Sequence, residues 1–172
     1  MDLISLQNMP KGRKILMKVL ILSDSHSKRC YLEEILKREQ SAEIIIHLGD
    51  GADDMLAESA YTAGKALYQC AGNCDSSLFD FPKTQLINIC GRKIFACHGH
   101  QYSVKVGLDK IYFAALEKGA ELCLYGHTHQ PHEDSKDGIC FFNPGAVNNA
   151  EYAIAQISEN TLKLQHKSLY NF

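Results

Sequence analysis

The stretch 17-MKVLILSDSH-26 decides the fold, because an uninterrupted apolar run leads directly into Asp24 and His26. Continuous apolar runs of this kind are typical of a strand buried on both faces of a sheet. The pattern predicts a strand over residues 18–23 whose end carries a carboxylate and an imidazole. The same combination of a buried strand and a polar end recurs along the chain.

The first half of the chain alternates predicted strands with predicted helices. Apolar, β-rich runs predict strands over 43–48 and 65–71. Apolar residues at helical spacing predict a helix over 29–39 and a short one near 52–62. The resulting order, β-α-β-α-β, is typical of a parallel sheet with right-handed crossovers.

The second half predicts a helix over 108–118 and mainly short strands, over 84–90, 93–98, 121–125, 139–142, 151–157 and 161–167. Gly91-Arg92 favours a hairpin between the first two of these strands. Asp137-Gly138 and Asn143-Pro144-Gly145 are typical of turns. We expect one α/β domain with mixed sheets over 17–172, and residues 1–16 as an N-terminal extension outside it.

Composition narrows the class of protein. The 172 residues are 45% hydrophobic and 22% charged, which is ordinary for a globular domain, and the formal net charge is −2. No polybasic surface is predicted, so we expect neither long nucleic acid nor an anionic membrane as a partner. No apolar run approaches the roughly 20 residues of a membrane span. Seven cysteines, an odd number without a CxxC pair, indicate reduced thiols and a cytoplasmic location.

Polar side chains follow five of the predicted strands. The five strand ends read Asp24-Ser25-His26, Gly49-Asp50, Gly72-Asn73-Cys74-Asp75, His98-Gly99-His100 and Gly126-His127-Thr128-His129. Strand ends and their loops are where α/β folds form ligand sites, and glycine permits tight turns there. Carboxylate, imidazole and amide groups without a cluster of thiolates do not indicate a structural zinc site.

The spacing of the histidines suggests how they share a cavity. Asp24-x-His26 and His127-x-His129 would each place two donors on one side of an extended segment, because side chains alternate there. Taken alone, Asn73 is a common turn residue and His98 a hydrogen-bonded core histidine. The whole constellation favours metal binding instead. For His47, His132 and His166, nothing in the sequence indicates a role in the site.

Taken in order, these strand ends resemble the calcineurin-like metallophosphoesterase family, within it the small single-domain phosphodiesterase branch. The resemblance spans residue 17 to about residue 167. It implies a four-layer α-β-β-α fold, with two mixed β-sheets packed as a sandwich and flanked by helices. It also implies two divalent metal ions. Mn is the expected metal, and Ni, Fe, Co and Zn are the alternatives. The implied ligands are Asp24, His26 and His129 for one ion, Asn73, His98 and His127 for the other, and Asp50 as the bridge.

The resemblance implies hydrolysis of a small or nucleotide-like phosphodiester. Two adjacent ions can hold a bridging hydroxide and clamp a phosphoryl group. The charge at such a centre favours diesters over monoester dianions. Two carboxylates and two dications leave a net charge of +2, which a hydroxide and a diester monoanion together neutralise. Many relatives carry histidine where this chain has Cys74, and that histidine is taken to protonate the leaving oxygen. Cys74 is a poorer acid beside a dication, so His100 is the other candidate acid.

Two other functions fit the same pattern. One is a phosphomonoesterase. The other is a protein-interaction scaffold, because a retromer subunit shares the fold with an impaired metal site. All seven ligand positions are filled here by competent residues, which favours the enzyme. We also expect Tyr102 and Phe79 to line the substrate pocket, and a homodimer or homotetramer.

Overall fold

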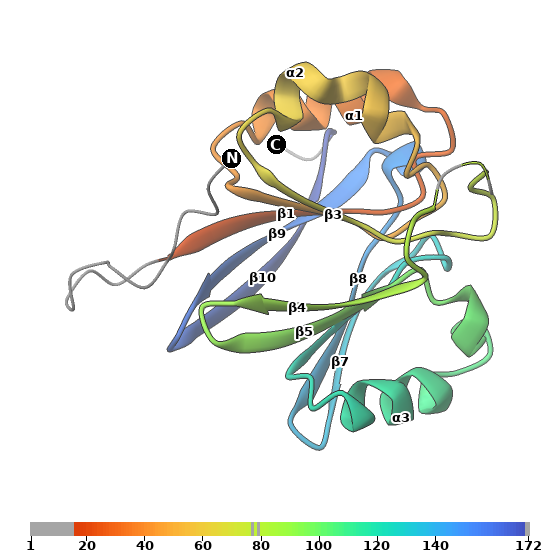
Figure 1. Ribbon diagram of the computed structural model, residues 1–172, viewed down its shortest axis with the longest axis vertical. Helices are drawn as coiled ribbons and strands as arrows, with labels where there is room; N and C mark the ends of the chain where they lie inside the picture. The colour runs from red at the N-terminus through yellow and green to blue at the C-terminus, as the bar shows by residue number, and fades with distance from the viewer. Residues whose placement is uncertain (1–15, 77, 79, 171–172) are drawn as a thin grey trace.

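The chain forms two five-stranded β-sheets that pack face to face, with helices on both outer sides (Figure 1). This computed structural model describes residues 16–76, 78 and 80–170. The first sheet has the order β10-β9-β1-β2-β3 and the second the order β4-β5-β6-β8-β7. The predicted four-layer sandwich is therefore confirmed.

The strands of the first sheet are β1 (Met17–Leu22), β2 (Ile44–His47), β3 (Ala66–Gln69), β9 (Glu151–Ser158) and β10 (Thr161–Ser168). Those of the second are β4 (Thr84–Ile89), β5 (Arg92–Cys97), β6 (Leu122–Leu124), β7 (Pro131–Lys136) and β8 (Ile139–Pro144). The α-helices are α1 (Arg29–Arg38), α2 (Ser59–Thr62) and α3 (Asp109–Glu117). The 3-10 turns are η2 (Asp54–Glu58), η3 (His100–Tyr102) and η4 (Val147–Asn149).

Alternation along the central strands builds three apolar layers. In β1, Val19 and Ile21 face the second sheet, whereas Leu20 and Leu22 pack under α1. In β5, Ile94 and Ala96 join the layer between the sheets, whereas Phe95 packs with α3. Figure 1 shows α1 and α2 over the first sheet and α3 over the second. A strand covered on both faces has no polar side, which explains its uninterrupted apolar sequence.

The strand pairing carries the polar strand ends to one edge. β1 pairs in parallel with β2, and β2 with β3, as the β-α-β-α-β pattern predicts. β5 and β6 are parallel in the second sheet. The carboxyl ends of parallel strands lie at the same edge of a sheet, so the loops that follow them gather there.

Several local expectations need correction. The helix predicted near 52–62 is mostly a 3-10 turn, η2, followed by the short α2. Strand β7 was not predicted, because all of its side chains are exposed and polar apart from Pro131. Asn143 and Pro144 are not in a turn: both belong to β8, and the chain turns at Gly145, whose φ is 84°.

Two further expectations concern residues that lie outside the described part of the chain. Apart from Leu16, the predicted N-terminal extension lies outside the described residues, as does Phe79. In the part of the chain that is described, no helix has the length and apolar character needed to cross a bilayer.

Candidate metal centre

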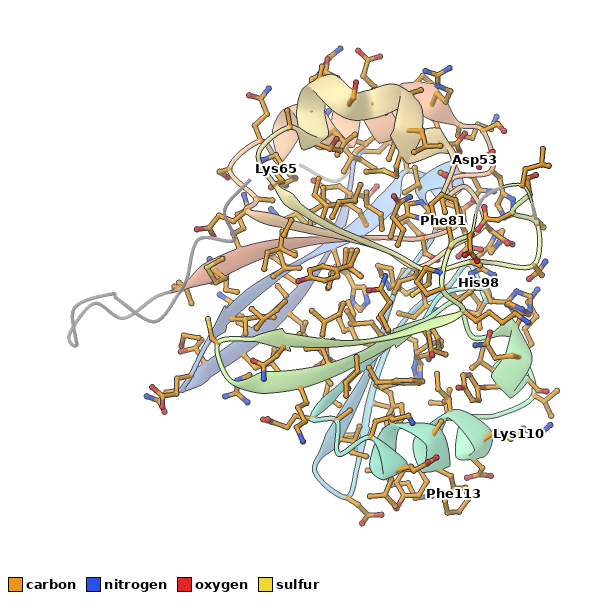
Figure 2. The ribbon with its side chains drawn as sticks, viewed as in Figure 1. Asp53, Lys65, Phe81, His98, Lys110 and Phe113 are labelled. Atoms are coloured by element: carbon orange, nitrogen blue, oxygen red, sulfur yellow. The ribbon has the colours of Figure 1, made fainter. Side chains whose placement is uncertain are left out.

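The candidate site lies where the loops after β1, β2, β3, β5 and β6 meet at the edge of the two sheets. Figure 2 shows His98 between the two sheets at this edge. Asp24, Asp50 and His98 have at most 2% of their surface exposed. Burying two carboxylates side by side is unfavourable without a compensating positive charge.

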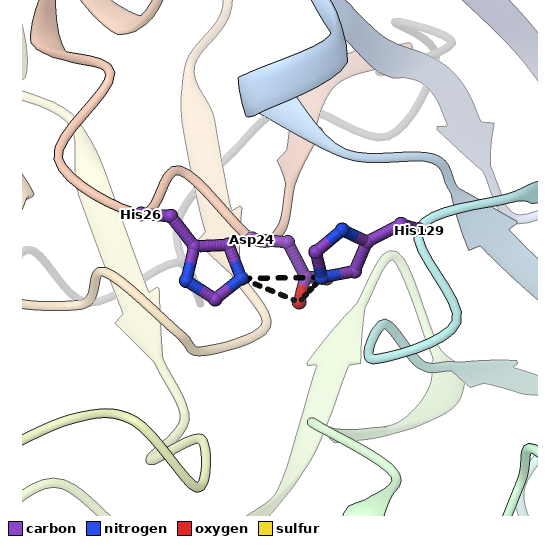
Figure 3. A group of neighbouring side chains, drawn as sticks. All are labelled: Asp24, His26 and His129. Carbon is purple, nitrogen blue, oxygen red and sulfur yellow. Dashed lines mark hydrogen bonds and ion pairs between the residues drawn. The ribbon is translucent and has the colours of Figure 1, made fainter.

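Asp24, His26 and His129 form one compact group (Figure 3). The Nε2 atoms of His26 and His129 lie 3.1 Å apart, and the Nε2 of His129 lies 3.0 Å from Oδ1 of Asp24. The Nε2 of His26 lies 3.7 Å from the same oxygen. Three ligand atoms therefore point at one spot, although His129 follows His26 by more than a hundred residues.

A second group contains Asp50, His98 and His127. The Nε2 of His98 lies 3.3 Å from Oδ2 of Asp50 and 3.9 Å from Oδ1 of Asp24. The ring centroids of His98 and His127 are 5.0 Å apart. The Oδ2 of Asp50 also lies 3.8 Å from His26, so this carboxylate stands between the two groups.

Neighbouring hydrogen bonds orient these ligand atoms. Oδ2 of Asp24 accepts hydrogen bonds from the Ser23 hydroxyl and the His127 amide, which leaves Oδ1 facing the centre. Oδ1 of Asp50 accepts the Cys74 amide at 2.7 Å, which leaves Oδ2 facing the centre. Such outer partners are a common feature of metal sites.

The ionisation of Asp50 suits a metal ligand. Burial alone would raise the pKa of its carboxyl group. When Nε2 of His98 carries a proton, this ring and the hydrogen bond from the Cys74 amide outweigh burial and hold the pKa of Asp50 well below its usual range. Asp50 is therefore an anion at neutral pH.

Two buried atoms at the centre lack a hydrogen-bond partner among the described residues, namely Oδ1 of Asp24 and Nε2 of His98. Nδ1 of His98 lies 3.0 Å from the Leu48 carbonyl oxygen, and a carbonyl only accepts, so Nδ1 carries the proton. In the neutral ring, Nε2 then presents a lone pair to the carboxylates. The lone pair of the His98 nitrogen and those of the buried carboxylate oxygens then face one another without a proton between them. A bound cation would satisfy all of these atoms.

The backbone at this site is strained in a way that supports function. Five predicted ligands have a positive φ between 43° and 67°, namely Asp24, His26, Asp50, His127 and His129. A non-glycine residue in this region costs roughly 1–2 kcal/mol, and such residues cluster at functional sites. The prediction that Asp24-x-His26 and His127-x-His129 are extended is therefore wrong. Tight left-handed turns, and not strand alternation, aim these side chains inward.

Asn73, the remaining predicted ligand, lies in the loop after β3, directly before Cys74. Its side chain is exposed, and its amide nitrogen lies 3.2 Å from Sγ of Cys74. Its assignment to the second ion stays a prediction.

The two candidate acids lie on different sides of the centre. Cys74 groups with His26 and Asp50, and burial with the nearby Asp50 raises the pKa of its thiol. His100 lies on the other side, with its ring centroid 5.4 Å from that of His98 and 6.2 Å from that of His127. Burial, then the adjacent His98, lower the pKa of His100, so its ring is neutral at pH 7.

Asp75 is a positioning residue that sequence reasoning missed. Its carboxylate accepts the backbone amides of Asp50, Gly51, Ala52 and Gly72 at 2.6–3.0 Å. It thereby ties the loop after β2 to the loop after β3. The only available signal was its position in Gly72-Asn73-Cys74-Asp75, directly after a strand.

Asn143 and Asp54 were also missed as positioning residues. Buried Asn143 donates to the Gly126 carbonyl oxygen at 2.9 Å and to the Thr128 hydroxyl at 3.1 Å, which holds the His127–His129 loop. The Asp54 carboxylate accepts the Ser25 hydroxyl and the Ser27 amide, which holds the loop after β1. No local pattern announces these contacts, because each partner is distant in sequence.

The remaining histidines have partners elsewhere. His132 pairs with the Tyr125 hydroxyl, and His166 stacks on Phe142 and contacts the Asn143 carbonyl oxygen. Fully buried His47 accepts the Gly49 amide, and burial lowers its pKa to about 4. Tyr102 lies half-buried in η3 against Phe95.

The fold and the cluster of carboxylates and imidazoles together define a two-sheet metallohydrolase. Residues 17–161 match the calcineurin-like phosphoesterase superfamily domain. The chain therefore belongs to this superfamily and is a metal-dependent phosphoric ester hydrolase.

Two relatives illustrate the match. The probable metallophosphoesterase YsnB of Bacillus subtilis is 35% identical over 132 residues, which cover 76% of this chain and 75% of the relative. Phosphodiesterase YfcE of Escherichia coli K12 is 28% identical over 154 residues, which cover 77% of this chain and 80% of the relative.

Solved structures share the fold. A predicted phosphoesterase of Streptococcus pneumoniae TIGR4 superposes with a TM-score of 0.76 at 25% identity and covers 91% of each chain. Vacuolar Protein Sorting 29 of Cryptosporidium parvum superposes with a TM-score of 0.72 at 17% identity, covering 89% of this chain and 98% of that one. The second likeness shows the fold alone.

Proposed function

We propose that this chain hydrolyses small phosphodiesters at a centre of two divalent metal ions. The observation that carries the proposal is the pair of ligand groups that meet at Asp50, one with His26 and the other with His98. Asp24, His26 and His129 would hold one ion, and His98, His127 and the predicted ligand Asn73 the other, with Asp50 shared. When bound, such ions activate a water nucleophile and stabilise charge on the phosphoryl group.

The chain's own residues prepare this site before substrate arrives. The Leu48 carbonyl oxygen fixes the tautomer of His98, and the Cys74 amide fixes the rotamer of Asp50. Preorganised ligands need no rearrangement when charge develops, which is the main electrostatic advantage of such sites. His100, with a neutral ring at the edge of the second group, is placed to donate a proton to the leaving oxygen once protonated.

The diester preference rests on charge and on the relatives. The sum of charges at the predicted centre favours a diester monoanion, and YfcE is named a phosphodiesterase. We propose manganese as the preferred ion, since the carboxylate and amide oxygens among the predicted ligands suit it. A homodimer or homotetramer is the proposed assembly, and sedimentation velocity of the purified chain tests it.

The competing function is a protein-interaction scaffold, which the fold likeness to Vacuolar Protein Sorting 29 supports. The two orphaned buried atoms at the centre favour the enzyme, because a scaffold has no need to keep them.

The deciding experiment is reconstitution. Protein stripped with a chelator is loaded in turn with Mn²⁺, Fe²⁺, Co²⁺, Ni²⁺ and Zn²⁺, and assayed on bis-p-nitrophenyl phosphate and p-nitrophenyl phosphate. Asp50→Asn should reduce diester turnover about a thousandfold, since several kcal/mol of charge stabilisation depend on the ions it helps to hold. The matched control is Asp109→Asn, whose carboxylate is 87% exposed on α3. Metal-loaded protein that is inert towards both esters would favour the scaffold.

A further inference from the structure

Cys74 lies beside the candidate centre and belongs to a third group of possible ligand atoms. Its Sγ atom, a ring nitrogen of His26 and a carboxylate oxygen of Asp50 all lie within 4.8 Å of one another. The Cys74 amide donates to Oδ1 of Asp50 at 2.7 Å, which holds the backbone of Cys74 against this carboxylate. Among the described residues, no other cysteine belongs to such a group.

Two buried atoms without a hydrogen-bond partner point into the same space. Oδ1 of Asp24 lies 3.7 Å from Nε2 of His26 (Figure 3), and Nε2 of His98 lies 3.3 Å from Oδ2 of Asp50. The side chains of Asp24 and His98 are fully buried, and neither atom has a partner in the described part of the chain. The thiol of Cys74 therefore adjoins atoms that themselves indicate a bound cation, unlike an isolated surface cysteine.

Cys74 stands on the solvent side of this group. Asp24 and Asp50 are buried and the His26 side chain is 28% exposed, whereas Cys74 belongs to the exposed residues. A sulfur ligand would thus approach from the side on which a substrate enters. Catalytic metal sites keep one coordination position open to solvent, whereas structural zinc sites are closed by a further protein ligand.

Sulfur also discriminates between ions. Thiolate ligands favour Zn²⁺, whereas Mn²⁺ is better suited to the oxygens of carboxylates, carbonyl groups and water. A cysteine binds a metal only as the thiolate, so the thiol proton is released to solvent when the sulfur–metal bond forms. The choice of ion therefore decides whether the sulfur is coordinated.

We propose that Cys74 binds Zn²⁺ together with His26 and Asp50 and closes the open position of that ion, whereas Cys74 stays free beside Mn²⁺. Coordination by the sulfur is independent of any reaction at the centre. The inhibition by zinc that follows from it rests on the proposed function. The chain then has a closed zinc form and an open manganese form, which differ in one protein ligand.

Cobalt reports the sulfur directly, because Co²⁺ substitutes for Zn²⁺ and a bound thiolate adds a charge-transfer absorption in the near ultraviolet. Chelator-treated protein loaded with Co²⁺ should show this absorption, and Cys74→Ser should lack it. Cys30→Ser, the same change at an exposed cysteine of α1, should retain it.

Metal affinities, measured by competition with a chromophoric chelator, provide the second test. Cys74→Ser should weaken binding of Zn²⁺ about 10–100-fold or more, since even the outer partners of metal ligands contribute that much. Binding of Mn²⁺ should be unchanged, and Cys30→Ser should alter neither affinity. The inference is overturned by a cobalt form of the unmodified chain without the absorption, by an absorption that persists in Cys74→Ser, or by equal losses of affinity for the two ions.

Turnover separates failure of this inference from failure of the proposed function. For each protein, the rate on bis-p-nitrophenyl phosphate in the Zn²⁺ form is divided by that in the Mn²⁺ form, which cancels any part that Cys74 plays as an acid. This ratio should rise in Cys74→Ser and stay constant in Cys30→Ser. An unchanged ratio in Cys74→Ser would overturn the closing role of the sulfur. Protein that is inert with every ion would contradict the proposed function alone, because the cobalt absorption still decides whether Cys74 is a ligand.

Discussion

Replacing Asp75 by asparagine should destabilise both the fold and the metal centre. Each carboxylate oxygen of Asp75 accepts two backbone amides: Oδ1 those of Gly51 and Ala52, and Oδ2 those of Asp50 and Gly72. Asparagine keeps one oxygen and presents an amino group where the other stood. Two amides then face a donor instead of an acceptor.

The magnitude follows from the number of bonds lost. Hydrogen bonds to charged groups contribute roughly 1.5–3 kcal/mol each. Asp75 is only partly buried, so the lower value applies, and two lost bonds give a decrease of about 3 kcal/mol in the free energy of unfolding. The Asp50 backbone loses one of these ties, so affinity for the ion should fall about 10–100-fold, as for other outer partners of metal ligands.

Urea unfolding of the metal-free protein measures the first effect, and competition with a chromophoric chelator measures the second. Asp109→Asn serves again as the control, because its carboxylate is exposed and faces Lys136 instead of this loop. A change within about 0.5 kcal/mol, the range of ordinary surface substitutions, together with unaltered metal affinity would refute the assigned role of Asp75.

Three further predictions concern the same edge of the sheets. His127→Ala should release one ion more readily than the other, because His127 groups with Asp50 while His129 groups with Asp24; equal loss of both ions, measured by elemental analysis along a chelator titration, would contradict the split. The second prediction concerns His47, whose pKa is about 4 in the folded chain and 6.5 in the unfolded chain, so that its ring is neutral when folded at pH 7. Between these two pKa values the unfolded chain binds more protons than the folded chain. The free energy of unfolding therefore falls as the pH falls through this window. When the pH is lowered from 7 to 5, the free energy of unfolding of His47→Phe, measured by urea titration, should fall by about 2 kcal/mol less than that of the unmodified protein. Equal decreases in the two proteins would exclude this role of His47. Gly72→Ala places a Cβ against the side chain and amide of Asp50 and should cost about 2 kcal/mol or more in thermal or urea unfolding, whereas Gly107→Ala, which meets no atom within 4 Å, should be tolerated.

Much of the fold could be predicted because strand burial leaves a local signature. β1, β2 and β5 each contain an uninterrupted apolar run (19–22, 44–46 and 94–97) because both faces are covered there. The turn at Gly91 marks the hairpin between β4 and β5. β7 escaped prediction because an exposed edge strand has no buried face, and its pairing with β8 is what makes it a strand. The 3-10 character of η2 was equally invisible, since its Asp54 carboxylate is committed to the loop after β1.

The candidate site divides in the same way. The residue types and their positions at strand ends were legible locally, because parallel strands must bring their carboxyl ends to one edge. The six predicted ligands that are aspartates or histidines do converge there, and Asn73 lies in the loop after β3 with its amide nitrogen on Cys74. The direction of each side chain could not be predicted from the sequence, because it depends on positive φ angles at residues other than glycine. Long-range contacts impose these φ angles.

The amino-acid order of 17-MKVLILSDSH-26 and its counterparts thus suffices to indicate buried strands that end in metal-ligand chemistry. Packing of two sheets is needed to bring His129 within 3.1 Å of His26, and the ties of Asp75 and Asn143 are needed to hold the loops there. The physical reason is distance along the chain: a strand is encoded within a few residues, whereas a ligand cluster requires contacts between segments about a hundred residues apart.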